Sequence, residues 1–288
     1  MNIRISGAGG LIGSALVPAL RAGGHTVQPL SRGQVGDFGP ADAVVHLGGE
    51  NIAAGRWTAA KKARIHDSRV EGTRRLCEAL AGLERPPAVL ICASAVGYYG
   101  DRGDERLDES SAPGGDYLAG VCREWEAAAE PAVRRGIRVV YLRFGLVLSG
   151  GGGALPALAK PFRWGAGGVI GGGRQWWSWI ALEDAVRAAH HALVTAELSG
   201  PVNAVSPQPA TNREFTRILG RVLHRPTFFP LPAFAARLAL GEMADALLLS
   251  SQRVEPRRLT ATGFAFRQPE LESALRSALS AGRPSGPG

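Results

Sequence analysis

Short apolar runs alternate along this chain with longer segments in which apolar residues recur every three or four positions. The runs have the length of buried β-strands and are Ile3–Ser6, Thr26–Leu30, Ala43–Leu47, Ala88–Ala93, Ile137–Leu142 and Val202–Val205. The longer segments have helical spacing and are Leu11–Ala22, Ala59–Ala81, Tyr117–Arg135 and Glu183–Ala196. Strands that alternate with helices indicate a parallel sheet with helices on both faces. The sequence therefore predicts a doubly wound α/β fold.

The character of the chain changes after residue 150. Gly150–Gly153 and Gly165–Gly173 are long glycine-rich loops, which globular proteins usually keep for function. Further helices are predicted at Arg213–Leu223, Ala233–Leu249 and Pro269–Leu279. We therefore predict a first domain over 1–205 with a glycine-rich insertion at 150–180, a smaller C-terminal α/β domain over 206–280, and a disordered tail at 281–288.

The composition is that of an ordinary globular protein. Hydrophobic residues make up 45% and charged residues 20% of the 288 positions, which is enough for a sizeable core. There is no run of 18 apolar residues, so no membrane partner is expected. Cys77, Cys92 and Cys122 have neither C-x-x-C nor Cys/His spacing, so we expect no metal site and a reducing, cytoplasmic location.

A net charge of +8 raises the question of nucleic-acid binding. Only three of the 33 basic residues are lysines, and the arginines are scattered in pairs such as Arg74-Arg75 and Arg134-Arg135. Neither a long basic run nor interleaved aromatic residues are present, and these are the usual signs of a nucleic-acid surface. The pattern argues against a nucleic-acid partner.

A glycine-rich motif follows the first predicted strand directly. Gly7-Ala8-Gly9-Gly10-Leu11-Ile12-Gly13 has the form G-x-x-G-x-x-G between a strand and a helix. Gly7 permits a tight turn, Gly10 permits a pyrophosphate to approach the helix N-terminus, and Gly13 permits close packing of helix and strand. We therefore predict a Rossmann fold whose cofactor contacts include Gly7, Gly9, Gly10, Leu11, Ile12 and Gly13. A tight turn without a ligand is the alternative.

The second predicted strand indicates which dinucleotide would bind. NAD sites usually carry an Asp or Glu about 20 residues after the motif. Here the strand ends in Ser31-Arg32, and no carboxylate appears before Asp37. The Arg32 guanidinium suits a 2′-phosphate, and Ser31 adds a hydroxyl donor. NADP is the predicted cofactor; a solvated Arg32 without a ligand is the other interpretation.

With these motifs the chain resembles the short-chain dehydrogenase/reductase superfamily in its extended, epimerase-like form. It is most similar to an atypical epimerase-like family with its own C-terminal segment, and the resemblance covers roughly residues 1–280. The similar motifs are His46–Asn51, Arg56-Trp57, Asp67–Arg69, Ala93–Gly100, Trp125-Glu126, Arg143–Leu148, Trp177–Ile180 and Ser251–Pro256.

The resemblance implies further cofactor contacts. It implies that Leu47, Gly48 and Gly49 lie on the adenosine side of the cofactor. Arg64 and Arg69 on the following helix would reach the cofactor, or would form a solvated helical face. Val147, just after the fifth strand of the sheet, would lie at the nicotinamide end. A smaller C-terminal domain on the substrate side is also implied.

The catalytic residues of the superfamily are only partly present. Its enzymes usually combine a Ser or Thr with a Tyr and with a Lys four residues after that Tyr, which lowers the Tyr pKa. The nearest matches are Ser94, or Ala95 if the match is shifted by one position, and Tyr117, but position 121 is Val. An unassisted Tyr with a pKa of about 10 is ionised in roughly one molecule in a thousand at pH 7. Tyr98, Tyr99 and Glu124 are possible substitutes, with ordinary structural roles as the alternative.

Four tryptophans mark the predicted substrate side. Trp164 directly precedes the Gly165–Ile180 loop, and Trp176, Trp177 and Trp179 lie within it. Their rings would stack on a ring or a sugar. Core packing is the competing interpretation for at least two of them. Arg143 and Arg253 would meet an anionic substrate group or form buried ion pairs.

Two functions follow from these observations. The first is an NADP-dependent oxidoreductase or epimerase, active as a monomer or homodimer on an unidentified small carbonyl or sugar-like substrate. The second is an NADP-binding regulatory or sensor protein with little turnover, because the lysine is absent at Val121. The fold class alone does not choose between them.

The assignment of NADP is tested by Arg32→Ala. We expect the affinity for NADP to drop well below that of the wild type while the affinity for NAD barely changes, because only NADP carries the 2′-phosphate. Calorimetric titration with both nucleotides measures the two affinities. Equal losses for NADP and NAD would contradict the assignment.

Overall fold

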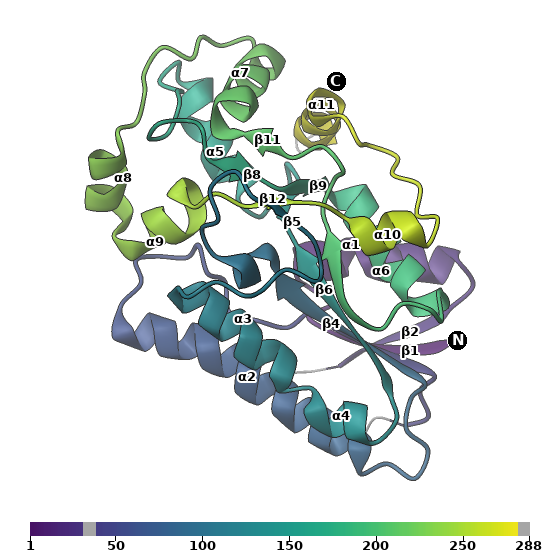
Figure 1. Ribbon diagram of the computed structural model, residues 1–288. Coiled ribbons are helices and arrows are strands. Elements are labelled where there is room, and N and C mark those ends of the chain that lie inside the picture. The colour runs from purple at the N-terminus through teal and green to yellow at the C-terminus, as the bar shows by residue number, and fades with distance from the viewer. Residues whose placement is uncertain (31–38, 282–288) are drawn as a thin grey trace.

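The computed structural model describes residues 1–30 and 39–281, and in it the predicted doubly wound sheet is confirmed. Six parallel strands lie in the order β10-β6-β4-β3-β1-β2 (Figure 1). Their bounds are Asn2–Ser6 (β1), Thr26–Leu30 (β2), Ala43–His46 (β3), Val89–Ala95 (β4), Arg138–Phe144 (β6) and Gly200–Ala204 (β10). The tail at 282–288 lies outside the described residues, as do Ser31 and Arg32.

Helices cover both faces of the sheet. α1 (Leu11–Ala22) and α6 (Leu182–Val194) lie against each other on one face. On the other face α2 (Ala59–Ala81) contacts α3 (Tyr117–Ala127) and α4 (Glu130–Arg134). The central strands β3, β4 and β6 are mostly buried, as expected for a parallel sheet covered on both sides, whereas β2 at the sheet edge buries only Val27.

Two helices predicted as single segments are each divided in the structure. The helix predicted over Tyr117–Arg135 ends at Ala127 and resumes at Glu130, because Pro131 lacks an N–H and its ring would clash with the carbonyl four residues earlier. The helix predicted over Ala233–Leu249 divides at Gly241, whose φ of 63° lies outside the helical region. The resulting elements are α8 (Ala233–Leu240), α9 (Glu242–Ala244) and the π-helical turn η2 (Asp245–Leu249).

The C-terminal part shares a second hydrophobic core with the segment after residue 145. Within 150–180 only the glycine stretches are loops, since α5 (Leu155–Arg163) and the strand β8 (Trp176–Trp177) form between and after them. Their apolar side chains pack with those of α7 (Asn212–Leu223) and α11 (Leu271–Ala281), around Trp179 and Phe215. The remaining elements are the 3₁₀ turn η1 (Val96–Tyr99), the strands β5 (Arg106–Leu107), β7 (Leu146–Leu148), β9 (Trp179–Ala181), β11 (Ala210–Thr211) and β12 (Arg253–Val254), and α10 (Arg257–Ala261). The domain limits at 205 and 280 stay predictions.

Candidate nucleotide-binding and active site

The strand order reverses between β1 and β3, which is a topological switch point, the place where open α/β sheets form a ligand crevice. From β1 the chain crosses by α1 to β2 on one side, whereas β3 and the strands after it lie on the other side. Because α1 and α2 cover opposite faces of the sheet, the connection from β1 to α1 and the connection from β3 to α2 leave the sheet in opposite directions at this point. In open α/β sheets such a switch point is where ligands bind. The Gly7–Gly13 loop and the Leu47–Gly49 segment lie at its two sides.

The Gly7–Gly13 loop is shaped by close backbone contacts. Gly7 has a φ of 74°, and a Cβ there would lie 2.7 Å from the carbonyl carbon of Leu47. A Cβ on Gly13 would lie 2.2 Å from the carbonyl oxygen of Gly7. Both distances exclude any larger residue. The motif therefore brings the start of α1 directly against the end of β3.

The N-terminus of α1 is open to an anion. Its N-cap is Gly10, which supplies no side-chain cap, and the first turn of the helix contains no acidic residue. Gly9 and Gly10 are exposed, and a Cβ on Gly9 would meet no atom within 4 Å. Backbone N–H groups and the helix dipole at such an end favour phosphate groups. The residues present thus fit the pyrophosphate of a dinucleotide.

Arg69 supports the segment that follows β3. Its guanidinium donates to the carbonyl oxygens of Ile65 and Glu50 at 3.2 and 3.0 Å. It also lies against Gly49, where a Cβ would be 3.3 Å from its Cζ atom. Arg64 is more exposed, with Nε 3.8 Å from the Glu50 carboxylate. Both arginines lie beside the Leu47–Gly49 segment, and their contact with a cofactor stays a prediction.

A buried histidine that sequence reasoning missed joins β1 and β3 under the crevice. Nδ1 of His46 lies 2.5 Å from Oγ of Ser6, and its Nε2 lies 3.1 Å from Oγ1 of Thr73. Trp125 donates to the same Thr73 oxygen at 2.9 Å. Burial lowers the pKa of His46 to about 4, so the ring is neutral near pH 7. In the sequence it stands at the end of an apolar strand and begins the His46–Asn51 motif.

The second glycine loop meets the first at Leu11. A Cβ on Gly153 would lie 2.8 Å from one Leu11 methyl carbon, and a Cβ on Gly152 would lie 3.3 Å from the other. Val147 belongs to β7, and its carbonyl oxygen is near Gly153. The structure therefore brings the Val147 segment to the start of α1, although the two are far apart in sequence.

Ser94 belongs to a polar row across three strands. Ser94 of β4 is in register with Arg143 of β6, which is in register with Asn203 of β10. Ser94 donates to Glu126 of α3 at 2.7 Å, and Arg143 makes two hydrogen bonds of 2.8 Å to the same carboxylate. The side chain of Arg143 is only 3% exposed. Arg143 is thus a buried ion-pair partner, which is one of the two roles predicted for it.

Tyr99 completes this row. Its hydroxyl accepts from Arg143 at 2.9 Å and donates to Asn203 at 2.7 Å. Burial raises the pKa of Tyr99 to about 12, so the phenol keeps its proton near pH 7. The Arg143 guanidinium carbon also lies 3.5 Å from the centre of the Tyr98 ring. Sequence reasoning did not assign Glu126 or Asn203 to a site, although Glu126 was among the similar motifs.

Tyr117 takes part in a different group of contacts. Its hydroxyl donates to the carbonyl oxygen of Lys62 on α2 at 2.8 Å, and its ring packs edge-on against Trp57 at 5.6 Å. Burial raises the pKa of Tyr117. Glu124 is engaged with His66 on α2 at 2.8 Å. The hydroxyls of Ser94 and Tyr117 therefore serve two separate hydrogen-bonded groups.

The four tryptophans have different roles. Trp177 and Trp179 are buried in the second core. Trp176 donates to Asp104 at 2.8 Å, and the Arg253 guanidinium carbon lies 4.2 Å from its ring centre. Trp164 is exposed to solvent. Core packing thus explains two of the four, as one interpretation predicted.

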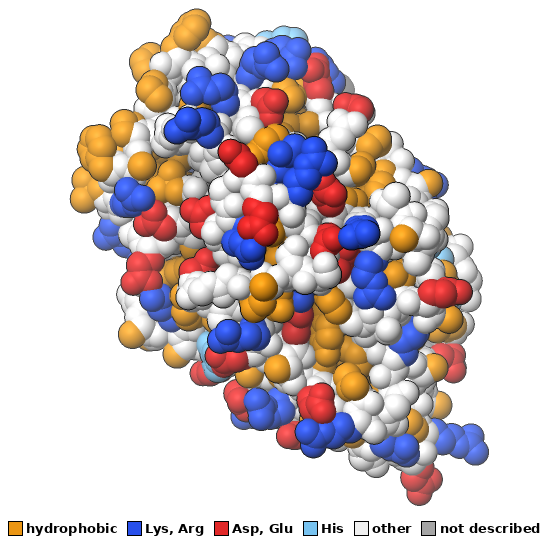
Figure 2. All heavy atoms as spheres, viewed as in Figure 1, with side chains coloured by type: hydrophobic (Ala, Val, Ile, Leu, Met, Phe, Trp, Pro, Cys, Tyr) orange, Lys and Arg blue, Asp and Glu red, His pale blue; other side chains and the backbone are white. Residues whose placement is uncertain are grey.

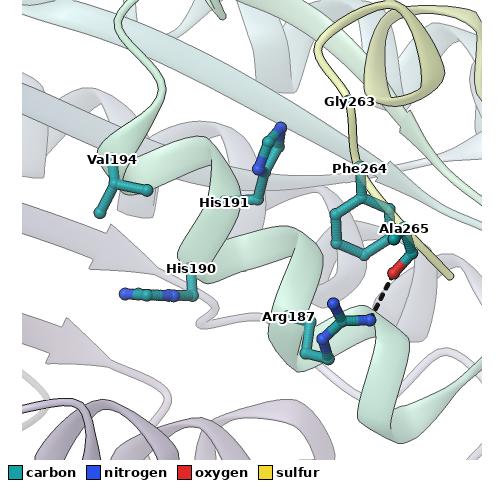
Figure 3. A pocket seen from close by; sticks show the side chains of 7 residues that line it. All are labelled: Arg187, His190, His191, Val194, Gly263, Phe264 and Ala265. Atoms are coloured by element: carbon teal, nitrogen blue, oxygen red, sulfur yellow. Dashed lines mark hydrogen bonds between the residues drawn. The ribbon is translucent and has the colours of Figure 1, made fainter. Parts of the chain in front are cut away.

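A separate hollow of about 240 Å³ lies between α6 and residues 263–265 (Figure 3). Arg187, His190 and His191 line it, and burial lowers the pKa of both histidines. It contains none of the predicted site residues. Across the described ranges, no three His, Cys, Asp or Glu residues are grouped as a metal site. No helix found there is long and apolar enough to cross a membrane.

The chain belongs to the NAD dependent epimerase/dehydratase family, whose model matches residues 3–204. A domain of unknown function, DUF1731, matches residues 231–278. An epimerase family protein of Mycobacterium tuberculosis is 45% identical over an alignment of 290 positions, gaps included, that covers 95% of this chain and 96% of that protein. These matches confirm the resemblance to an epimerase-like family with its own C-terminal segment.

Solved structures show the same fold. The human epimerase family protein SDR39U1, crystallised with NADPH, superposes with a TM-score of 0.89 at 35% identity and covers 97% of this chain and 99% of its own. A nucleoside-diphosphate sugar epimerase from Corynebacterium glutamicum has a TM-score of 0.79 at 37% identity, over 98% of this chain and 58% of that one. Both similarities extend over the C-terminal segment.

The buried His46 predicts a pH dependence of stability. Its pKa is about 4 in the folded chain and 6.5 in the unfolded chain, so only the unfolded chain gains this proton as the pH falls from 6.5 to 4. The stabilising contribution of the neutral His46 ring is therefore present above pH 6.5 and is lost as the pH falls from 6.5 towards 4. Between pH 7 and pH 5 the wild type should lose about 2 kcal/mol more free energy of unfolding than His46→Gln. Urea unfolding at both pH values measures the difference.

His66→Gln provides the control of opposite sign. The carboxylates of Glu124 and Asp67 raise the pKa of His66, so its contribution is present below pH 6.5 and is lost as the pH rises through the folded-state pKa. Between pH 7 and pH 5 the His66→Gln variant should still show the decrease in free energy of unfolding that the wild type shows. An equal loss in the wild type and in His46→Gln would contradict the assignment to His46.

Proposed function

We propose that the crevice between β1 and β3 binds NADP(H). The observation that carries this proposal is the uncapped N-terminus of α1 directly after the Gly7–Gly13 loop, at the switch point of the sheet. A relative with the same fold was crystallised with NADPH, which supports the choice of cofactor. Backbone N–H groups at Gly9–Gly13 would hold the pyrophosphate, and Leu47–Gly49 would face the adenosine. Ser31 and Arg32 would hold the 2′-phosphate.

We further propose that the protein is an oxidoreductase or epimerase of a small carbonyl or sugar-like substrate. Membership of the epimerase/dehydratase family and the similarity to a nucleoside-diphosphate sugar epimerase support this reaction class. A bound nicotinamide supplies hydride chemistry. The residues of this chain would hold the reacting groups at the ends of β4 and β7, near Ser94 and Val147, under the second glycine loop.

A second candidate, an NADP(H)-binding sensor with little turnover, rests on a specific observation. The Tyr117 hydroxyl is engaged by the Lys62 carbonyl, and Val121, four residues later, is buried. Ser94 directs its proton to Glu126. The groups that usually move a proton in this superfamily are thus absent or used in structural hydrogen bonds. This arrangement favours binding without rapid catalysis.

Cofactor binding at α1 is tested by Gly9→Asp. A side chain at this position meets no neighbouring atom, and a carboxylate beside a helix N-terminus stabilises the helix. The variant should therefore fold as the wild type does. The added negative charge beside the pyrophosphate should weaken NADPH binding by about ten-fold or more. Isothermal titration calorimetry measures the affinity.

Gly9→Ala is the matched control. It adds a Cβ at the same position without a charge, so its affinity for NADPH should stay close to that of the wild type. Equal affinities of Gly9→Asp and the wild type would place the cofactor elsewhere. Absence of NADPH binding by the wild type would overturn the proposal itself.

Turnover distinguishes the two candidate functions. The wild-type protein is incubated with NADPH and a panel of aldehydes and ketones, and separately with NADP⁺ and a panel of nucleotide sugars, because removal of a hydride from a sugar needs the oxidised cofactor. The absorbance of NADPH and the sugar products are followed. Consumption of NADPH or epimerisation of any one substrate supports the enzyme. Tight NADPH binding with no reaction across the panel supports the sensor.

A further inference from the structure

One corner of the molecule carries large apolar side chains that face solvent. Trp164, Phe228, Phe229, Phe234 and Leu238 are each at least 63% exposed, and Phe228 is 81% exposed. We call these five residues the apolar patch. Proteins expose single apolar residues freely, but a group of five with four aromatic rings indicates an interaction surface.

The two segments that carry the apolar patch are held side by side by backbone hydrogen bonds. The Phe229 N–H donates to the carbonyl of Gly167 at 3.4 Å, and the Leu231 N–H donates to that of Val169 at 2.8 Å. α8 begins directly afterwards, and Phe234 and Leu238 lie four positions apart on one face of it. Figure 2 shows hydrophobic side chains gathered at the upper left, over α8 and the segment that leads to it.

The segments that form the apolar patch contain cations and no acids. Residues 155–173 and 215–241 include six Lys and Arg residues and neither Asp nor Glu. Two of the six are paired, Arg221 with Glu272 and Arg237 with Asp245. The other four form no ion pair with any described residue, and they are Lys160, Arg163, Arg217 and Arg225. Lys160 Nζ lies 5.8 Å from the Trp164 ring centre, so positive charge adjoins the apolar patch.

We propose that the apolar patch docks the protein on a membrane surface that contains anionic lipid. Aromatic rings on an exposed face enter the headgroup region, and flanking cations are attracted by lipid phosphates. The apolar patch supplies the exposed aromatic rings, and the neighbouring lysine and arginines supply the cations. The expectation of no membrane partner rested on the absence of a spanning segment, and a surface-bound protein needs none.

Charge also argues against a second copy of the chain as the occupant. A two-fold interface places the same surface on both subunits, so the cations around the apolar patch would face one another. Such contacts are repulsive for the four cations that form no ion pair with a described residue. The negative charge of an anionic lipid surface is complementary to these cations, whereas the same face of a second copy is not.

Sedimentation with lipid vesicles tests the proposal. The full chain should bind vesicles of phosphatidylcholine mixed with phosphatidylglycerol, bind less to phosphatidylcholine alone, and dissociate at high salt because of screening. Phe228→Ser combined with Phe229→Ser should lower the partition coefficient by about ten-fold or more. Val133→Ser combined with Val194→Ser changes two exposed apolar residues on α4 and α6, and should bind as the wild type does.

The role of charge is tested separately. A triple variant combines Lys160→Gln, Arg163→Gln and Arg225→Gln. Its affinity for anionic vesicles should be lower than that of the wild type by about ten-fold or more. The control has the same net charge and changes Arg74, Arg75 and Arg134 to Gln, and it should keep most of the binding. Thermal unfolding checks that each variant is folded.

Three results would overturn the proposal. The first is failure of the wild type to sediment with anionic vesicles, and the second is equal losses in the patch variants and their controls. The third is a concentration-dependent dimer, seen by sedimentation velocity, that the Phe228 and Phe229 substitutions abolish while vesicle binding is absent. That outcome would assign the apolar patch to a second copy of the chain.

Discussion

The nucleotide crevice depends on the close approach of two backbone segments with no side chain between them. Gly7 lies against the carbonyl of Leu47, and Gly13 lies against the carbonyl of Gly7, at distances where a methyl group does not fit. α1 therefore starts at the carboxyl edge of the sheet, beside the end of β3. Its uncapped N-terminus faces the crevice as a consequence of that packing.

The polar residues beneath the same edge form one hydrogen-bonded group around a buried ion pair. Glu126 and Arg143 form a buried ion pair; Ser94 donates to Glu126, and Tyr99 accepts from Arg143 and donates in turn to Asn203. A buried pair of this kind is tolerated only when its hydrogen bonds are complete. Within this group the Ser94 hydroxyl donates to Glu126. Family membership alone does not establish a reaction.

The glycine-rich insertion and the C-terminal helices depend on each other. Trp177 and Trp179 come from the insertion, and Phe215 and Leu275 come from α7 and α11, yet all four belong to one hydrophobic cluster. This shared core positions the second glycine loop against Leu11. The exposed corner around α8 lies outside it, which leaves the apolar patch facing solvent.

The sequence by itself determined the sheet strands, the helices α1 and α2 and the Gly7–Gly13 motif, because local periodicity and glycine spacing are properties of neighbouring residues. It did not predict the break at Gly241, because the spacing of apolar residues does not reveal a positive φ at a single glycine. The His46 contacts and the row from Ser94 to Asn203 were decided by the tertiary structure alone. They join residues as far apart as Ser6 and Thr73, or Tyr99 and Asn203, and only strand register and helix packing bring such residues together.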